Sequence, residues 1–424
     1  MNPIQSPRGT RDILPDRQPA WQYVTETARQ TAGQLSFRPI TIPSYEEAAL
    51  FHRSIGDGTD IIDKELFLTR GIRSTEEETY ALRPEATAGV VRAFIQHGMH
   101  TWPQPVRLYT ILNVFRYDRP QKGRYREHTQ FDVEYFGDTG PFADAWVIFT
   151  TWSFLNRLGL SGLELQLNTL GTSVERSRYA AQLQEYFRPL RDRISEDSVA
   201  RLEKNPLRIL DSKDPRDKEF MDAAPRLSEA LGPESQAHFD AVRQYLEKWR
   251  IPYRLNEQLV RGLDYYSHTA FEWTVSGQEG QQSSLGGGGR YDGLLPQLGG
   301  STVGAVGAGL GLDRIIETCE QQGVFDRLTQ HRPDAYLVAA DTAGKTAVIE
   351  LIPELIAAGL SVDAGLDKDS VGAQMKAAAK SQSRWAVIIG ATEAERGEVA
   401  VKDLESSEQR TVSQAELVSF LRDA

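Results

Sequence analysis

The feature of this sequence that most constrains its fold is a pair of predicted strands flanking a basic hairpin, between Val106 and Gly137. The first strand, VRLYTILNVFR, is rich in β-branched and aromatic residues. In the second, polar and apolar residues alternate in the order Gln130, Phe131, Asp132, Val133, Glu134 and Tyr135. Successive side chains of a strand point to opposite faces of the sheet. We therefore predict two antiparallel strands with one face against a core and the other lining a polar pocket.

The hairpin between these strands is strongly basic, with five cationic residues in the eleven positions from Arg116 to Arg126. The whole chain has a formal net charge of −11, so this local positive charge indicates an anion site suited to phosphates. The carboxylates of the pocket face suit a cationic or N–H-bearing small molecule. The alternative is a solvated hairpin with ordinary surface arginines, because charge runs are commonly just exposed to water.

Composition limits the classes of protein that this chain can belong to. A length of 424 residues predicts two or three domains, and 40% hydrophobic with 25% charged residues is ordinary for a soluble globular protein. A single cysteine, Cys319, excludes an internal disulfide framework and fits a reducing cytosol. We expect no signal peptide, no membrane span and no side-chain metal site, and therefore a cytoplasmic protein. The negative net charge argues against nonspecific coating of nucleic acid, but not against a shaped nucleic-acid partner.

The chain divides into four predicted regions. Residues 1–171 and 253–325 carry strand signals mixed with helices and together predict an α+β core with an antiparallel sheet. Between them, residues 172–252 have apolar residues at three- and four-residue spacing and predict a helical insertion. After a linker marked by His331-Arg332-Pro333, residues 333–424 alternate strands with helices, which predicts a small α/β domain with a mostly parallel sheet.

Two motifs outside the hairpin admit both a structural and a functional interpretation. In LRPEATAG, Glu85 and Thr87 precede a predicted helix, so Glu85 either caps the helix or binds an α-ammonium group. Arg261 lies among apolar residues in LVRGLDYY and is expected to be partly buried. It either forms a salt bridge to a carboxylate such as Asp264 or presents a fixed cation to a carboxylate or phosphate of a ligand.

The glycine-rich segments also admit both a structural and a functional interpretation. The run Gly286–Gly289 is either a flexible turn or a place where a ligand approaches bare backbone. The glycines of GAVGAGLGLDR have the wrong spacing for a dinucleotide fingerprint and are expected to let a strand pack beneath a nucleotide. Arg314 follows in the first turn of a predicted helix, where a cation is unfavourable unless an anion binds there. The segment AADTAGKT resembles a phosphate-binding loop but has Ala339 at its first glycine position, which favours a turn and helix cap.

Several of these segments resemble one family. FRYDRPQKGRYREHTQFDVE resembles motif 2 of class II aminoacyl-tRNA synthetases, in the form carried by histidyl-tRNA synthetases. LVRGLDYYSHTAFEW, Leu259 to Trp273, resembles the histidine signature of that family, and LRPEATAG, GGGRYDGL and GAGLGLDRII also fit, in family order. The resemblance implies a ligase that activates histidine with ATP to histidyl-adenylate and then transfers it to the 3′ end of its cognate tRNA.

The resemblance also implies roles for particular residues. Arg116 and Arg261 would be catalytic, with Arg116 on the α-phosphate and Arg261 between the substrate carboxylate and the α-phosphate. Arg124 and Arg314 would bind the outer phosphates of ATP, with Mg²⁺ completing the neutralisation. The amino group of histidine would lie near Glu85, Thr87 and Gln130, and its imidazole near Glu134, Tyr265 and Tyr266.

Partners follow from the same resemblance. The region from 333 resembles an anticodon-binding domain, the basic hairpin would approach the tRNA acceptor end, and PSYEEAALFHRSIGD resembles the interface motif of a homodimer. Two other classes remain: a non-catalytic, synthetase-like regulatory subunit of ATP phosphoribosyltransferase, and a non-catalytic tRNA-sensing module. The presence of Arg116, Arg261, Arg314 and the extra domain favours the enzyme.

Overall fold

The computed structural model describes residues 3–423 except 57–58, 72–78, 119–124, 211, 213, 222, 261–262, 264, 277–282, 329–331 and 369. The chain forms two compact units, Met1–Leu328 and Thr329–Ala424. No helix in the described ranges is long and apolar enough to cross a membrane.

The centre of the first unit is one sheet, which has eight strands within the described residues, in the order β1-β5-β6-β11-β10-β9-β7-β8. The six central strands pair antiparallel, whereas the edge strands β1 and β8 pair parallel with their neighbours. The strands are β1 Arg38–Pro39, β5 Val106–Phe115, β6 Glu127–Phe136, β7 Leu163–Thr169, β8 Tyr253–Leu255, β9 Ser267–Val275, β10 Ser284–Arg290 and β11 Ala305–Gly311. The antiparallel core predicted from the sequence is confirmed, and β5 and β6 are the predicted pair on either side of the hairpin.

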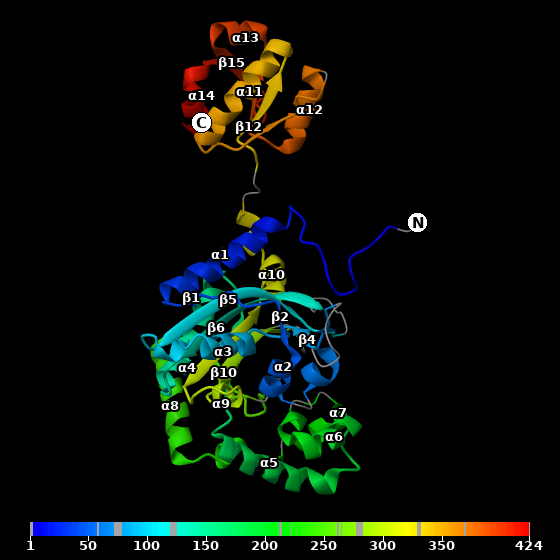
Figure 1. Cartoon of the computed structure of the whole chain (residues 1–424), viewed down its shortest axis with the longest axis vertical. Helices are drawn as coiled ribbons and strands as arrows, with labels where there is room; N and C mark the ends of the chain where they lie inside the picture. Colours follow the sequence, from blue (N-terminus) through cyan, green and yellow to red (C-terminus); the bar gives the residue numbers. More distant parts are fainter. Residues whose placement is uncertain are drawn as a thin grey trace. The chain divides into compact units, whose positions relative to one another are not determined.

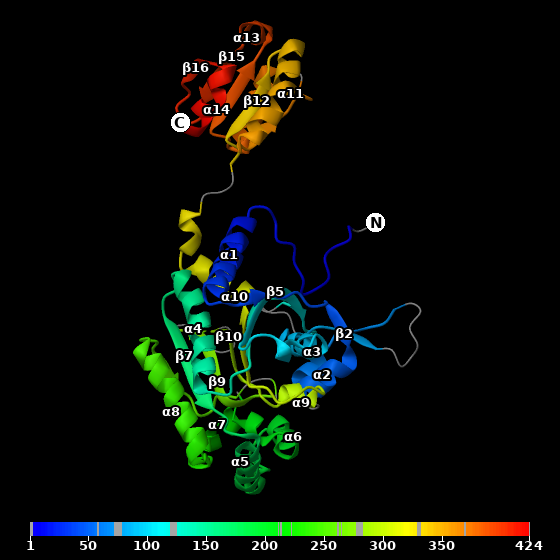
Figure 2. The ribbon, with the colours of Figure 1, turned by 60° about the vertical axis from the view of Figure 1, so that its left-hand side comes forward.

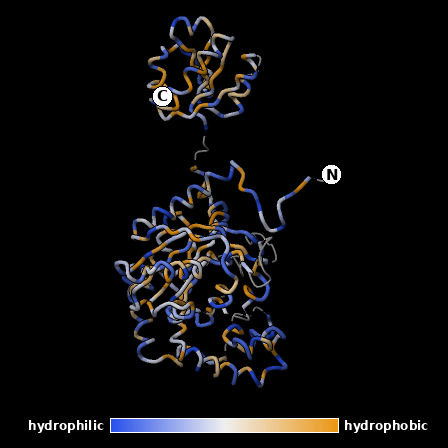
Figure 3. The backbone as a smooth tube through the Cα atoms, in the orientation of Figure 1, coloured by the Kyte–Doolittle hydropathy of each residue, from blue (hydrophilic) through white to orange (hydrophobic). Residues whose placement is uncertain are grey.

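One face of the sheet packs against four helices: α1 Gln18–Gln34, α4 Pro141–Arg157, α8 Pro233–Lys248 and α10 Leu312–Gln321. The apolar residues of β6, Phe131, Val133 and Tyr135, are buried in this core as the alternation predicts. Helix α8 lies at the end of the predicted insertion, yet its Phe239, Val242 and Leu246 belong to this same core. In the backbone tube of Figure 3, hydrophobic and hydrophilic residues alternate along the strands and helices of this unit.

On the opposite side lie α3 Thr87–Gln96 and α9 Leu294–Gln297, and the insertion helices α5 Ser173–Phe187, α6 Glu196–Lys204 and α7 Pro215–Met221 share the buried cluster of this side. Figures 1 and 2 show α5 to α7 on the side of the sheet away from α1. Beside α3, α2 Ala48–Ile55 packs near a small antiparallel sheet of β2 Tyr45–Glu47, β4 Tyr80–Leu82 and β3 Leu68–Thr69. Short turns of helix occur at Ile61–Glu65, Met99–Thr101, Arg188–Leu190, Pro206–Ile209, Leu227–Glu229 and Val324–Arg327.

The run Gly286–Gly289 is part of β10, a central strand of the sheet, so its interpretation as a flexible turn is wrong. A Cβ atom on Gly288 would collide with the carbonyl oxygen of Gly307 on β11. Glycine therefore lets these two strands approach more closely than larger residues would allow.

The second unit has its own core and a five-stranded sheet in the order β13-β12-β14-β15-β16. Its elements are β12 Ala335–Ala339, α11 Thr342–Ala357, β13 Val362–Ala364, α12 Val371–Ser381, β14 Trp385–Ile389, α13 Ala391–Arg396, β15 Glu398–Asp403, β16 Gln409–Ser413 and α14 Gln414–Asp423. Strands β13, β12 and β14 pair parallel, as predicted, whereas β14–β15 and β15–β16 pair antiparallel, so the parallel part of the sheet is limited to its first three strands. Asp341 Oδ1 accepts a hydrogen bond of 2.8 Å from Gly344 N, which confirms the turn and helix cap predicted for AADTAGKT.

Candidate active site

The site is built on the polar face of β6, where Gln130, Asp132 and Glu134 lie in a row over the glycines of β11. A Cβ atom on Gly307 would collide with Glu134, and one on Gly309 would collide with Asp132. The glycines predicted to let a strand pack beneath a ligand therefore also make room for the carboxyl groups of the pocket. These residues come from segments about 175 positions apart, which the β6–β11 pairing brings together, as with Glu134 opposite Gly307.

Glu134 is fixed by hydrogen bonds to both of its carboxyl oxygens. Oε1 accepts from Thr87 Oγ1 at 2.6 Å and Oε2 accepts from the Tyr291 hydroxyl. The side chain is 1% exposed, and burial raises its pKa to about 8 although both hydroxyl groups oppose the rise. A carboxyl group with its orientation fixed and its proton easily gained or lost is suited to bond an N–H-bearing ring.

Glu85 caps helix α3, as one of its two interpretations predicts. Its Oε1 accepts from Ala88 N at 2.8 Å in the first turn of the helix. Burial raises the pKa of Glu85, although hydrogen bonds from the helix N–H groups and the charge of Arg116 oppose the rise. Because Thr87 bonds Glu134, the LRPEAT segment connects the two carboxyl groups of the pocket.

Arg116 lies at the end of β5, where its Nε donates to Pro84 O at 2.8 Å. Its positive charge lies close enough to two buried carboxyl groups, Glu85 and Asp132, to lower the pKa of both. Burial nevertheless raises the pKa of Asp132 well above its ordinary value, and Glu134 and Glu85 reinforce the rise. Among the described residues, the buried carboxyl groups of Glu85, Asp132 and Glu134 thus lie near the cations Arg116 and Arg83, and the carboxyl groups favour a ligand that brings positive charge or N–H donors.

Tyr265 and Tyr266 form one wall of the pocket. Both are buried, with their ring centroids 4.6 Å apart, and the Tyr265 ring meets the Tyr291 ring edge-on at 5.6 Å. Tyr266 lies so close to Gly289 of β10 that a Cβ atom there would come within 2.9 Å of its ring. Of the two tyrosines predicted from LVRGLDYY, Tyr265 therefore contacts the ring of Tyr291, whose hydroxyl bonds Glu134, and Tyr266 packs against Tyr265.

The structure describes only some of the arginines that we predicted to bind the phosphates of ATP. Arg314 lies in the first turn of α10, where its Nη1 donates to Ser284 O of β10 at 2.8 Å. Arg124 and Arg261 lie outside the described residues.

Two site residues were missed by sequence reasoning. Tyr291 comes directly after the glycine run in GGGRYDGL, and that position beside a strand of glycines was the available signal. Arg83 is buried beside Pro84 and donates to three backbone carbonyls, those of Asn113, Ile42 and Pro43, at 2.7 to 2.9 Å. It fixes the position of LRPEATAG against β5, and no local pattern distinguishes it from an ordinary surface arginine.

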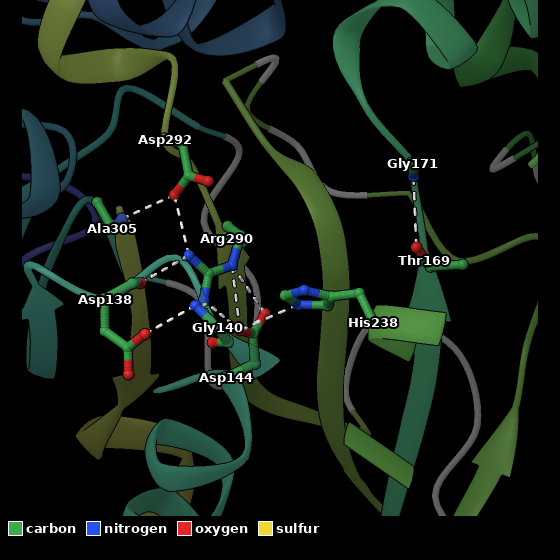
Figure 4. Close-up of polar contacts among 9 residues, drawn as sticks. All are labelled: Asp138, Gly140, Asp144, Thr169, Gly171, His238, Arg290, Asp292 and Ala305. Carbon is green, nitrogen blue, oxygen red and sulfur yellow. Dashed lines mark hydrogen bonds and ion pairs between the residues drawn. The ribbon is translucent and has the colours of Figure 1, made fainter. Parts of the chain in front are cut away.

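Beside the pocket, Arg290 fixes β10 to the neighbouring elements (Figure 4). It is fully buried and pairs with Asp144 of α4, which is also fully buried. Its remaining donors bond Asp292 at 3.1 Å and the carbonyls of Asp138 and Gly140 at 3.0 and 2.9 Å. This arginine serves the framework of the site, because its guanidinium is bonded entirely to the protein.

The first unit has an antiparallel sheet with a glycine-rich floor and a strand pair joined by a basic hairpin. It also places an arginine beside buried carboxyl groups. This combination defines the catalytic unit of a class II aminoacyl-tRNA synthetase. A family profile described as "Histidyl-tRNA synthetase" matches residues 9–315, and one described as "Anticodon binding domain" matches residues 334–424. The chain belongs to the histidyl-tRNA synthetase family.

Individual relatives resemble the chain over its whole length. A histidine--tRNA ligase of Desulforudis audaxviator (strain MP104C) is 44% identical over 421 residues, which cover 99% of this chain and 98% of that protein. A histidine--tRNA ligase of Synechococcus sp. (strain JA-3-3Ab) is 41% identical over 423 residues, 99% of each chain. The crystal structure of apo S. aureus histidyl-tRNA synthetase has a TM-score of 0.82 and 30% identity, covering 99% of this chain and 100% of that one.

Proposed function

We propose that this chain is a histidine–tRNA ligase, which activates histidine with ATP and transfers the histidyl group to the 3′ end of its cognate tRNA. The observation that carries the proposal is Glu134, fixed over a glycine floor by Thr87 and Tyr291 and adjoined by Tyr265 and Tyr266. A buried carboxyl group beside tyrosine rings can bond the N–H groups of an imidazole while the rings contact its apolar edges.

Specificity follows from the same arrangement. We propose that the imidazole of histidine bonds Glu134 and Tyr266, with Tyr265 nearby. An amino acid without ring nitrogens would leave these buried polar groups without their ligand partners. Sites built on such hydrogen bonds reject analogues by roughly 10⁴- to 10⁵-fold, so editing is not required.

The amino group of histidine would lie near Glu85, Thr87 and Gln130, next to the buried carboxyl groups of the pocket. Its carboxylate would then point to the end of β5, where Arg116 lies. Attack of this carboxylate on the α-phosphorus of ATP brings two anions together, so fixed positive charge must cancel their repulsion. We assign that role to Arg116 and Arg261, with positioning and electrostatics supplying most of the catalysis.

The outer phosphates of ATP would be bound by Arg124 and Arg314, with Mg²⁺ entering as part of the nucleotide substrate. Mg²⁺ commonly uses substrate phosphates, water and only one or two carboxylates as ligands. The position of Arg314 in the first turn of α10 supports this role, because an anion there would also meet the positive end of the helix dipole.

Three further proposals concern the whole protein. Residues 1–171 and 253–325 would form the catalytic core, residues 172–252 the insertion, and residues 333–424 a domain that binds the anticodon of histidine tRNA. The protein would act as a cytoplasmic homodimer through PSYEEAALFHRSIGD. That segment contains β2 and α2, and the half-exposed Tyr45 of β2 supports an interface there.

The deciding experiment is exchange of labelled pyrophosphate into ATP with each amino acid in turn. We expect exchange with histidine, dependent on Mg²⁺, and none above background with the other amino acids. Histidine binding without exchange would instead support the regulatory-subunit class, and exchange with a different amino acid would overturn the assignment of the pocket.

A further inference from the structure

One contact links the helical insertion to the wall of the candidate histidine pocket. Arg176, in the first turns of α5, donates from Nη1 to the backbone carbonyl of Tyr266 at 2.6 Å. The two residues are 90 positions apart in the sequence, and the donor carries a full positive charge. Hydrogen bonds with a charged partner are shorter and stronger than neutral ones, so this contact constrains the backbone at Tyr266.

Tyr266 is constrained on its other sides as well. Its ring packs against Tyr265 and approaches the backbone of β10 at Gly289, and the residue is 5% exposed. β9 begins at the next residue, Ser267, which pairs with Arg290. The sheet therefore fixes the position after Tyr266 and Arg176 fixes its carbonyl group, so the placement of the ring depends on both.

Glu175, the residue before Arg176 on α5, joins the two ends of the insertion. Glu175 accepts from Thr172 N at 2.6 Å at the start of α5, and from Ser235 Oγ at 2.7 Å in the first turn of α8. It also accepts from Gly232 N. Burial opposes ionisation, but the bonds from Ser235, Thr172 and Gly232 prevail and lower the pKa of Glu175 to about 2. These bonds connect the start of α5 to the start of α8, and Arg176 lies in this connected segment of α5.

The entry to the insertion is also bonded to the sheet. Gly171 N donates to Thr169 Oγ1 at 3.3 Å, as Figure 4 shows. Next to it, Leu170 N donates to His268 O and His268 N donates to Gly171 O, at 2.6 and 2.7 Å. The base of the insertion and the strand that follows Tyr266 are thus joined by backbone bonds, and Arg176 extends this connection to the pocket wall.

We propose that Arg176 is a positioning residue for amino-acid binding, through which the insertion helices α5–α7 and the histidine pocket are energetically coupled. The proposal rests on the proposed function, because it takes Tyr266 as a wall of the histidine site. Coupling between two sites is reciprocal. Histidine binding should stabilise the placement of α5, and a ligand that displaces the insertion should change the affinity for histidine.

The first test compares Arg176→Ala with Arg178→Ala in the full-length protein. Arg178 lies on the same helix and also donates to a backbone carbonyl, that of Ala230, but within the insertion. In pyrophosphate exchange, we expect Arg176→Ala to raise the KM for histidine roughly ten-fold, with much smaller changes in the KM for ATP and in kcat. Arg178→Ala should leave the KM for histidine unchanged. Equal KM values for Arg176→Ala and the unmodified protein would overturn the proposal.

A second variant and a second readout keep the test decisive if Arg176→Ala is unstable. Arg176→Lys retains the charge and a donor, so it should give an intermediate KM for histidine. In the unmodified protein, saturating histidine should slow amide hydrogen exchange along Ser173–Phe187. In Arg176→Ala, saturating histidine should leave the exchange rate of this helix unchanged. Protection that persists in the variant would contradict the coupling. Absence of histidine-dependent pyrophosphate exchange in the unmodified protein would instead overturn the proposed function. The failure of the coupling and the failure of the proposed function are therefore distinguishable.

Discussion

At the scale of single residues, Glu134 and Asp144 show how the same carboxyl chemistry has opposite consequences in two buried environments. Glu134 meets two hydroxyl groups, and burial raises its pKa to about 8. Burial also disfavours the charge of Asp144, but Arg290 and His238 together outweigh it and lower the pKa of Asp144 to about 2. The first group binds a proton more readily in the folded protein than in the unfolded chain, and the second does so less readily.

The raised pKa of Glu134 gives a pH dependence of stability with a definite sign. Between its ordinary pKa of 4.5 and its folded value of about 8, the folded state binds more protons than the unfolded state. Its contribution to stability therefore falls as the pH rises through this window. We expect Glu134→Gln, which cannot ionise, to gain stability relative to the unmodified protein between pH 5 and pH 8. Urea denaturation at several pH values measures this, and parallel stability curves would contradict it.

Asp144→Asn tests the opposite case and serves as the control for Glu134→Gln. The variant removes the fully buried partner of Arg290 and, among the described residues, leaves it only the partly exposed Asp292 as an acidic partner, so we expect a loss of about 3 kcal/mol in the free energy of unfolding at pH 7. Because the pKa of Asp144 is lowered from 3.8 to about 2, its stabilising contribution is present above pH 4 and is lost as the pH falls towards 2. The difference between the variant and the unmodified protein should shrink in that range. A difference that stays constant down to pH 2 would show that the ion pair does not stabilise the fold.

At the scale of elements, the N-terminal segment fixes the base of the basic hairpin. Arg11 donates to the Tyr125 hydroxyl at 2.6 Å and to Asp313 of α10 at 2.5 Å, and Arg126 N donates to Gly9 O at 2.7 Å. Asp313 also accepts from Thr129 N of β6 at 2.7 Å. The hairpin base, the first turn of α10 and the chain start are therefore one bonded unit next to the proposed phosphate site.

Arg11→Ala should loosen that unit without touching the histidine pocket. We expect the KM for ATP in pyrophosphate exchange to rise roughly three- to ten-fold, with the KM for histidine nearly unchanged, because one charged hydrogen-bonding group is lost. Arg17→Ala is the matched control, since Arg17 also connects the N-terminal region to α10 but pairs at 2.5 Å with Glu320, in an exposed ion pair. Exposed pairs contribute at most about 1 kcal/mol. A similar change in both KM values for Arg11→Ala would refute a specific role at the hairpin.

The elements also show where sequence reasoning succeeds. The alternation in β6 predicted both its buried face and its pocket face, because a strand with period two encodes the position of each side chain locally. The local signal failed for β10, where four glycines disfavour a strand on their own. That strand is stabilised by pairing with β9 and β11 on its two sides, which is a property of the assembled sheet.

The candidate site was predictable to a similar extent. Glu85, Thr87, Gln130 and Glu134 follow from motifs whose residues are close in sequence. Tyr291 and Arg176 do not, because the contacts that connect them to the site join residues 157 and 90 positions apart in the sequence. In the second unit, the sequence pattern does not predict β16, because QRTVS is a short, largely exposed edge strand with little apolar character.

At the scale of the whole molecule, the chain consists of two units with separate cores. The second unit buries its own cluster around Leu337, Val387 and Leu417, and its sheet pairs only with itself in the described residues. The residues of the candidate active site all lie in the first unit. We therefore expect that the proposed chemistry on small molecules and the proposed recognition of the anticodon can be separated by shortening the chain.

A chain that ends at Leu328 should keep amino-acid activation and lose most tRNA charging. We expect pyrophosphate exchange with histidine within about two-fold of the full-length value. The kcat/KM for tRNA should fall roughly 10²-fold, because linked binding modules commonly gain that much from a second contact. A melting curve must first show that the shortened chain is folded, and exchange activity then serves as the internal control for an intact pocket. If the folded, exchange-active fragment charges tRNA as well as the full chain, residues 333–424 do not supply the second tRNA contact and the anticodon-binding proposal is wrong.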